Sequence, residues 1–215
     1  MKTVITGTSK GIGRAIALKF LSCGHEVIGV DILPSSINDA RYTHIIADVY
    51  ASELPQIEGV EILINNAGVQ DSGRDIEVNL KGSIRVSEKY AFQDKIKSVL
   101  FIASSSARTG AEFPEYAASK GGMVAYMKNV ALRAAKYGAT VNSLSPGGVR
   151  TELNKRVMSD PVLWGKIMEQ TLLPKWAEAE EIAEWAYFVT VVNRSMTAQD
   201  ILIDNGEDAK ADFIW

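Results

Sequence analysis

The chain has 215 residues, 47% of them hydrophobic, which is enough for one well-filled domain and short for two. Its net charge of -3 comes from acidic and basic residues mixed along the sequence, so nucleic acid and anionic membranes are poor candidates as partners. One cysteine, Cys23, and two histidines, His25 and His44, form no cluster with metal-ligand spacing, so we expect no metal site.

Short apolar stretches alternate with stretches of helical periodicity from the first residues almost to the last. Strands are predicted near residues 2–6, 25–31, 43–47, 60–65, 97–103, 139–144 and 200–204. Helices are predicted near residues 11–23, 75–93, 114–137 and 178–192, with shorter ones near 50–57 and 153–170. This alternation predicts an α/β fold: a doubly wound parallel sheet covered by helices on both faces, in one three-layer domain over residues 1–215. No apolar run could span a bilayer, and the early first strand leaves no room for a signal peptide, so we expect a cytosolic protein.

A glycine-rich loop joins the first predicted strand to the first predicted helix. It reads Thr6-Gly7-Thr8-Ser9-Lys10-Gly11-Ile12-Gly13. Glycines permit a positive φ and let backbone amides approach a pyrophosphate, whose negative charge the start of a helix favours. Three spaced glycines are weak evidence alone, and an ordinary strand-to-helix turn is the alternative. The strand-loop-helix context favours a dinucleotide site that includes Gly7, Ser9, Lys10, Gly11, Ile12 and Gly13.

An acidic residue, Asp31, ends the second predicted strand. It lies about 20 positions after the glycines, where a carboxylate could accept hydrogen bonds from an adenosine ribose. Such a carboxylate would repel a 2′-phosphate, so the sequence favours NAD over NADP. Lys10 could attract that phosphate instead, which keeps NADP open, and Asp31 could also simply begin a turn before Pro34.

Tyr116 and Lys120 lie four positions apart in a predicted helix, between Pro114 near its start and Gly138 after its end. This spacing puts a phenol and an ammonium on one helix face. Tyrosine is a poor base at neutral pH because its reference pKa is about 10, and a neighbouring ammonium would stabilise the phenolate. An exposed helix pair without a function is the alternative. Together with the glycine loop, the pair predicts proton transfer beside a hydride.

Several short motifs, in order over nearly the whole chain, resemble those of the short-chain dehydrogenase/reductase family, whose members have a Rossmann fold. They are the glycine loop at 6–13, Asp48-Val49, Asn65-Asn66-Ala67-Gly68, Val78-Asn79-Leu80, Ser104-Ser105, Tyr116-Ala117-Ala118-Ser119-Lys120 and Pro146-Gly147-Gly148-Val149-Arg150-Thr151. Each motif is weak alone, and their number and order carry the resemblance.

The resemblance implies an oxidoreductase that transfers a hydride between NAD(H) and a small secondary alcohol or carbonyl compound. The implied catalytic residues are Asn79, Ser105, Tyr116 and Lys120. Tyr116 would be the general acid/base, Ser105 would bind the substrate oxygen, Lys120 would hold the nicotinamide ribose, and Asn79 would position a water. Ser104 is an open alternative to Ser105, and Ser106 is a third choice. Further cofactor contacts are implied for Asp48, Val49, Asn66, Ala67, Gly68, Tyr116, Lys120, Pro146, Gly147, Val149 and Thr151.

Two intervals are shorter than the family usually has. Only 16 residues separate Asp31 from Asp48, and only 10 separate Gly68 from Asn79. We expect a helix to be lost or reduced in each place, which would leave the cofactor floor intact and expose one flank of the site. The Ser105 to Tyr116 spacing is compressed as well.

The segment 152–176 carries apolar residues at partly helical spacing, which fits a substrate lid or ordinary core. An apolar lid favours a hydrophobic or aromatic carbonyl substrate, whereas Arg150, Lys155 and Arg156 could bind an acidic group. Gly121 and Gly122 inside the helix of Tyr116 suggest close approach by a second subunit, in a homodimer or homotetramer. A dinucleotide sensor or scaffold without turnover is the rival to an enzyme.

Overall fold

Seven parallel strands form the central sheet of the structure, a computed structural model that describes residues 1–111 and 113–210. The strands are β1 (Lys2–Thr6), β2 (Glu26–Asp31), β3 (Tyr42–Ile46), β4 (Ile62–Asn65), β5 (Ser98–Ile102), β6 (Thr140–Pro146) and β9 (Asp200–Ile203). Their order is β3-β2-β1-β4-β5-β6-β9, and every pair is parallel. The predicted doubly wound parallel sheet is therefore confirmed. The chain order reverses between β1 and β4, which is where ligands bind in such sheets.

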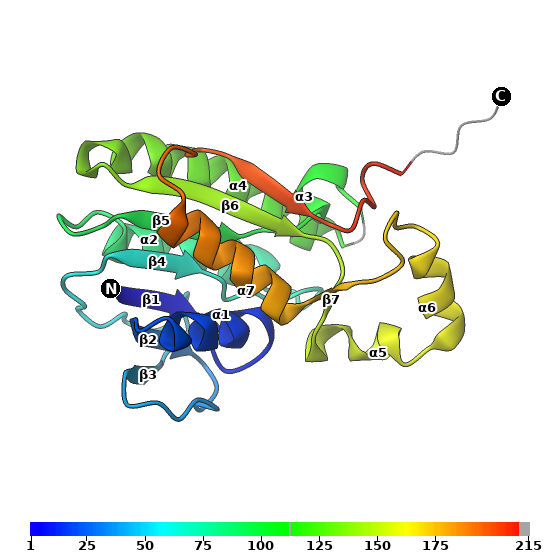
Figure 1. Cartoon of the computed structure of the whole chain (residues 1–215), viewed down its shortest axis with the longest axis horizontal. Coiled ribbons are helices and arrows are strands. Elements are labelled where there is room, and N and C mark those ends of the chain that lie inside the picture. Colours follow the sequence, from blue (N-terminus) through cyan, green and yellow to red (C-terminus); the bar gives the residue numbers. More distant parts are fainter. Residues whose placement is uncertain (112, 211–215) are drawn as a thin grey trace.

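Helices cover both faces of the sheet because successive strand side chains point to opposite sides. On one face α1 (Gly11–Ser22) and α7 (Ala179–Tyr187) lie side by side, as Figure 1 shows. On the other face lie α2 (Ser83–Tyr90) and α4 (Pro114–Ala134). In β1, Val4 belongs to the core under α2 and α4, and its neighbour Ile5 belongs to the core under α1 and α7. None of the helices in the described part of the chain is long and apolar enough to cross a bilayer.

Two predicted helices contain a π-helical part. The one predicted near 75–93 begins as the π-helix η1 (Ile76–Gly82) and continues as α2. The one predicted near 178–192 consists of α7 followed by the π-helix η4 (Phe188–Val192). A 3-10 turn, η2 (Ala135–Tyr137), extends α4. Asn79 lies inside η1, and π-helical turns often occur at functional sites.

The predicted helix near 153–170 is divided into three short pieces, η3 (Glu152–Asn154), α5 (Lys155–Met158) and α6 (Pro161–Met168). The break has a local cause: the Asp160 carboxylate accepts hydrogen bonds from the amides of Val162 and Leu163, which starts a new helix there. Three elements were not predicted: α3 (Ser106–Thr109) and the paired two-residue strands β7 (Val149–Arg150) and β8 (Ala177–Glu178).

The helix predicted near 50–57 is wrong. A turn follows Asp48, whose Oδ1 accepts hydrogen bonds from the amides of Tyr50 at 2.8 Å and Ala51 at 3.0 Å. Side-chain bonds of this kind compete with a helix, and Pro55 cannot donate to one. A helix was expected to be lost or reduced in the two short intervals: residues 32–41 contain none, and between Gly68 and Asn79 residues 69–74 contain none before the helical segment that includes η1 begins.

Gly122 is explained by a contact within the chain. A Cβ there would lie 2.8 Å from Cδ2 of Leu80 in η1, whereas one at Gly121 would meet only the Ala107 carbonyl at 3.8 Å. Contact between α4 and η1 accounts for Gly122 without a second subunit.

Candidate active site

A groove of about 550 Å³ opens at the carboxyl ends of the central strands. The predicted residues that line it are Gly7, Lys10, Gly11, Ile12, Gly13, Asp31, Asp48, Val49, Asn66, Ala67, Gly68, Tyr116, Lys120 and Thr151. Predicted residues outside this lining are Ser9, Asn79, Ser104, Ser105, Pro146, Gly147 and Val149. The groove therefore joins most of the motifs, which come from segments far apart in the sequence.

The glycine loop is packed against Asn66 at the end of β4, with no room for a side chain at Gly7 or Gly13. A Cβ at Gly13 would lie 2.1 Å from the Gly7 carbonyl oxygen and 2.3 Å from Nδ2 of Asn66. That Nδ2 donates to the carbonyl oxygens of Thr6 at 2.9 Å and Gly7 at 3.1 Å, while Gly7 and Gly11 have φ of 76° and 51°. Bare backbone at the start of α1 is the surface that a pyrophosphate requires, so the loop fits a dinucleotide.

Asp31 is fixed at the end of β2 by two backbone amides. Its Oδ2 accepts from Ser9 at 2.9 Å and its Oδ1 accepts from Leu33 at 2.9 Å. Each carboxylate oxygen can accept a further hydrogen bond. Ile32 beside it is 63% exposed and brings no positive charge, whereas Lys10 on the glycine loop also lines the groove.

Asp48 forms an ion pair across the groove wall that the sequence did not reveal. Arg74 Nη2 lies 3.2 Å from Asp48 Oδ2. Burial acts to raise the pKa of Asp48, but the amides of Tyr50 and Ala51 and the Arg74 guanidinium outweigh it, and the pKa is lower than the ordinary value. Arg74 comes from the shortened interval before Asn79, where a lone arginine gives no signal of its partner.

Lys120 is buried beside Tyr116, one turn further along α4. Its Nζ donates to the Ile102 carbonyl oxygen at 2.8 Å and lies 5.7 Å from the centre of the Tyr116 ring. Burial lowers the pKa of Lys120 to about 8, and the buried Asp75 carboxylate opposes this shift. Asp75, also missed from the sequence, accepts hydrogen bonds from the amides of Asp71 and Ser72.

Asn79 is fully buried and ties three segments together. Its Oδ1 accepts from the Val69 amide at 2.8 Å, and its Nδ2 donates to the Val69 carbonyl at 2.9 Å and to Ser119 Oγ at 3.0 Å. A Cβ on Gly68 would lie 3.1 Å from Asn79 Oδ1 and 3.5 Å from Lys120 Nζ. The structure thus brings Asn79 and Lys120 together around Gly68.

The serines follow β5 at the same edge of the sheet. Ser104 is buried, and its Oγ donates to Ser106 Oγ at 3.3 Å and accepts from the Ser106 amide at 3.2 Å. Ser105 precedes α3, and its amide donates to the Pro146 carbonyl at 2.9 Å. The choice between Ser104 and Ser105 stays a prediction. Pro146 and Gly147 lie at the end of β6, where a Cβ on Gly147 would be 2.9 Å from Cβ of Asp204.

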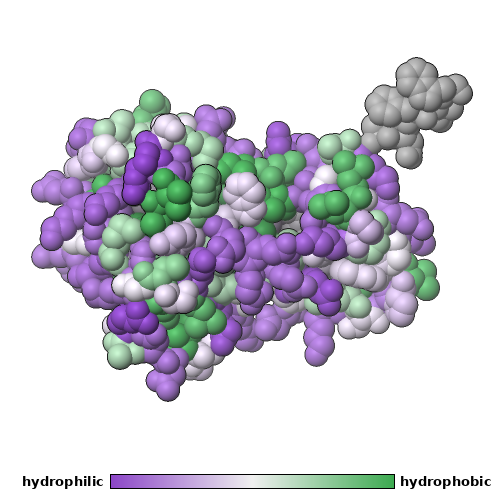
Figure 2. Space-filling view, viewed as in Figure 1, coloured by the Kyte–Doolittle hydropathy of each residue, from purple (hydrophilic) through white to green (hydrophobic). Residues whose placement is uncertain are grey.

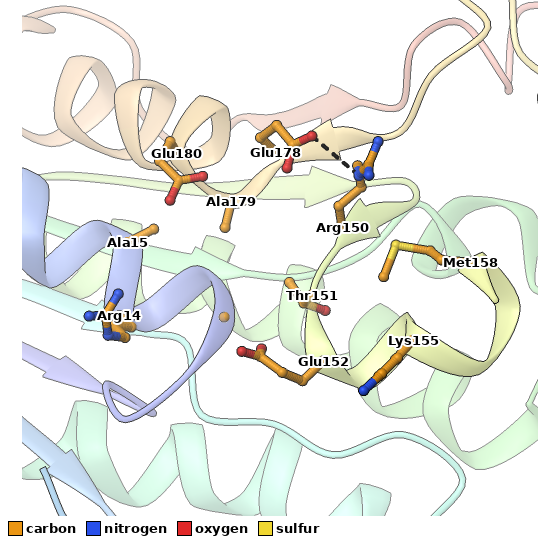
Figure 3. Close-up of a pocket in the computed structure, with 11 residues that line it drawn as sticks. Arg14, Ala15, Arg150, Thr151, Glu152, Lys155, Met158, Glu178, Ala179 and Glu180 are labelled. Atoms are coloured by element: carbon orange, nitrogen blue, oxygen red, sulfur yellow. Dashed lines mark ion pairs between the residues drawn. The ribbon is translucent and has the colours of Figure 1, made fainter. Parts of the chain in front are cut away.

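A second hollow of about 440 Å³ adjoins the groove where Gly11, Thr151 and Glu152 line both. Figure 3 shows side chains from α1, α5 and the start of α7 around it. Arginine, lysine and glutamate side chains share its lining, and Arg150 Nε pairs with Glu178 Oε1 at 3.3 Å. Because basic and acidic side chains both line this hollow, its charge does not favour one class of ligand. Among the described residues, no group of three or more metal-ligating side chains occurs.

The chain is similar to known proteins over almost its whole length. A family model described as Enoyl-(Acyl carrier protein) reductase matches residues 7–207. The L-rhamnose 1-dehydrogenase (NADP(+)) of Thermoplasma acidophilum is 28% identical, with 94% of each chain covered. A short chain dehydrogenase of Penicillium rubens is 31% identical over 76% of this chain and 74% of that protein. A solved structure of 4-hydroxyisoleucine dehydrogenase complexed with NADH is 28% identical, with a TM-score of 0.85 over 98% of this chain and 99% of that one.

Proposed function

The chain belongs to the short-chain dehydrogenase/reductase family of NAD(P)-dependent oxidoreductases, and we propose that it prefers NAD and interconverts a secondary alcohol and a ketone or aldehyde. The single observation that carries the proposal is the juxtaposition of buried Lys120 with Tyr116 in the groove that begins at the glycine loop. The shape of the loop supports dinucleotide binding. A Cβ at Gly13 would collide with the Gly7 carbonyl, so only glycine permits this close-packed backbone.

When bound, the nicotinamide supplies or accepts the hydride. In reduction, Tyr116 donates a proton to the carbonyl oxygen, and in oxidation it accepts the proton of the alcohol. The Lys120 ammonium stabilises the Tyr116 phenolate and holds the nicotinamide ribose. Ser105, with Ser104 as the alternative, donates a hydrogen bond to the substrate oxygen as charge develops. Asn79 orders the segment around Gly68 and positions a water that carries protons between Lys120 and solvent.

The preference for NAD is supported by residues of this chain. Asp31 is held by Ser9 and Leu33 so that its carboxylate faces the groove, where a 2′-phosphate would be repelled. Exposed Ile32 offers that phosphate no compensating charge. The related proteins include both an L-rhamnose 1-dehydrogenase (NADP(+)) and a 4-hydroxyisoleucine dehydrogenase complexed with NADH, so they do not decide the choice.

Parallel titrations with NADH and NADPH, followed by cofactor fluorescence, test the cofactor. We expect NADH to bind at least about 10-fold more tightly, since one unfavourable charge contact of about 1.4 kcal/mol has that effect. Asp31→Asn should reduce this ratio, because it removes the repulsive charge. Asp39→Asn, which removes a carboxylate paired with Arg41 in the same interval, is the matched control and should leave the ratio unchanged. Tighter binding of NADPH would reverse the preference, and binding of neither would refute the proposed activity.

The pH dependence of turnover tests Lys120. Its pKa is about 8 because burial lowers it while Asp75 holds it up. Removing the Asp75 charge must lower the pKa of Lys120 further, so the ammonium is lost at a lower pH. In Asp75→Asn we therefore expect the alkaline decline of kcat/KM to begin at lower pH than in the wild type. Glu77→Gln, which removes a half-buried carboxylate paired with Lys81 on the same helix, should leave the profile in place. A shift toward higher pH in Asp75→Asn would contradict the proposed role.

The segment 152–176 is proposed as the substrate lid. Leu153, Val162, Leu172 and Leu173 are exposed on it, which supports a hydrophobic or aromatic carbonyl substrate. Arg150 is engaged with Glu178, so Lys155 and Arg156 are the better candidates for an acidic group on the substrate.

A homodimer or homotetramer in the cytosol completes the proposal. Figure 2 shows hydrophobic residues clustered near the carboxyl end of α7. The exposed apolar residues of this stretch are Trp185, Phe188 and Val192, a suitable surface for a second copy. A dinucleotide sensor without turnover is the alternative function, and the effect of Tyr116→Phe on turnover separates the two.

A further inference from the structure

The short interval between β2 and β3 has a hydrogen-bond chain where a helix is missing. Thr8 Oγ1 lies 2.8 Å from Tyr42 Oη, and that Oη lies 2.8 Å from His44 Nδ1. His44 Nε2 lies 2.8 Å from the carbonyl oxygen of Leu33. These three hydrogen bonds connect Thr8 in the glycine loop, through Tyr42 and His44 on one face of β3, to Leu33.

The packing of β2 makes room for this chain. A Cβ on Gly29 would lie 2.1 Å from Tyr42 Oη and 2.4 Å from Thr8 Oγ1, so no other residue could occupy position 29 without displacing both groups. Thr8 is fully buried, and Tyr42 is half-buried. Burial raises the pKa of Tyr42, which keeps its hydroxyl protonated and able to donate at neutral pH.

The direction of each bond follows from the last acceptor. A carbonyl oxygen only accepts, so His44 Nε2 donates to Leu33. In a neutral imidazole the other nitrogen is then an acceptor, so Tyr42 donates to His44 Nδ1 and Thr8 donates to Tyr42 Oη. All three bonds are satisfied in one consistent order, and such chains strengthen cooperatively.

Leu33 is the point where this chain meets the groove. Its amide donates to Asp31 Oδ1, and its carbonyl also accepts from Ser9 Oγ at 3.2 Å. The Ser9 amide donates to the other Asp31 oxygen. Fixing Leu33 therefore fixes one of the two amides that orient the Asp31 carboxylate.

We propose that Tyr42 and His44 are positioning residues for the adenosine half of the cofactor, which hold Leu33 and thereby aim Asp31 at the ribose. The inference rests on the proposed function, since Asp31 matters only if a dinucleotide binds. It assigns a specificity role to a pair of residues on β3 that are outside the groove lining.

Tyr42→Phe and His44→Ala break the chain at different points, and NADH and NADPH are the probes. We expect each variant to raise the Kd for NADH about 5- to 10-fold, as for one hydrogen bond. The Kd for NADPH should rise less, because Asp31 does not favour that cofactor, so the NADH:NADPH ratio of affinities falls. A merely structural defect would weaken both cofactors equally and leave the ratio unchanged.

Tyr90→Phe is the matched control, because Tyr90 is a buried tyrosine whose hydroxyl donates to the Pro55 carbonyl at 2.7 Å, away from the groove. It should lower stability without changing the ratio. If the wild type binds neither cofactor, the proposed function fails. If the wild type binds and both variants keep its ratio, the positioning role is refuted while the proposed function stands. His44→Ala, at a half-buried position, decides the question should Tyr42→Phe not fold.

Discussion

Tyr116→Phe is expected to lower turnover by about 10²–10⁴-fold, the range that one general acid/base contributes. The variant keeps the ring beside Lys120 and removes only the hydroxyl that exchanges a proton with the substrate oxygen. NADH binding should stay at the wild-type level, because the ring and the ammonium still occupy the same space. Turnover is measured with the wild type on a panel of secondary alcohols and carbonyl compounds, with the variant then tested on the best substrate.

Tyr126→Phe is the matched control on the same helix. Its hydroxyl donates to Glu88 of α2, and neither residue lines the groove, so turnover should be retained. Full activity in Tyr116→Phe would show that another group transfers the proton. A wild type that binds NADH but turns over no compound in the panel would favour the sensor.

Gly13→Ala is expected to weaken NADH binding by about 100-fold and to lower the free energy of unfolding by about 3 kcal/mol, at the upper end for overpacking. The new Cβ would meet the Gly7 carbonyl and the Asn66 side-chain amide, neither of which can move freely. Displacing Gly7 also moves the loop amides that receive the pyrophosphate. Fluorescence titration with NADH and urea unfolding measure the two effects.

Gly24→Ala separates backbone strain from steric overlap. Gly24 has a φ of 82°, and a Cβ there would meet nothing within 4 Å. The control should cost roughly 1–2 kcal/mol of stability from its left-handed backbone and leave NADH affinity unchanged. Wild-type NADH binding by Gly13→Ala would mean that the loop does not hold the cofactor.

The sequence predicted the parts of the site that are encoded locally. Gly13, Asp31 and the Tyr116-Lys120 pair stand in short motifs whose meaning depends on a strand, a loop or a helix turn. Parallel pairing then brings these strand ends to one edge, so their convergence in a groove follows from the predicted fold.

Contacts that depend on register between distant segments could not be predicted in this way. Tyr42 and His44 stand two apart on one strand face, and a glycine inside β2 hints at close approach. Thr8, the partner of Tyr42, is however 34 positions away from it and is reached only through the register of three strands. Arg74 and Asp48, 26 positions apart, present the same difficulty. The wrong prediction of a helix near 50–57 has a local cause instead. Hydrogen bonds to the Asp48 side chain outweighed a weak helical periodicity.

The π-helical geometry of η1 makes the length of this segment as important as its composition. Each residue of a helix is rotated about the axis relative to its neighbour, by about 100° in an α-helix and by less in a wider π-helix, so one inserted or deleted residue rotates everything beyond it. Asn79 stands within η1, and its side chain must reach both Val69 and Ser119. Substitutions on the outer face of Ile76–Gly82 can therefore accumulate over evolution, whereas a single-residue change in length between residues 75 and 83 would turn Asn79 away from its partners and be eliminated.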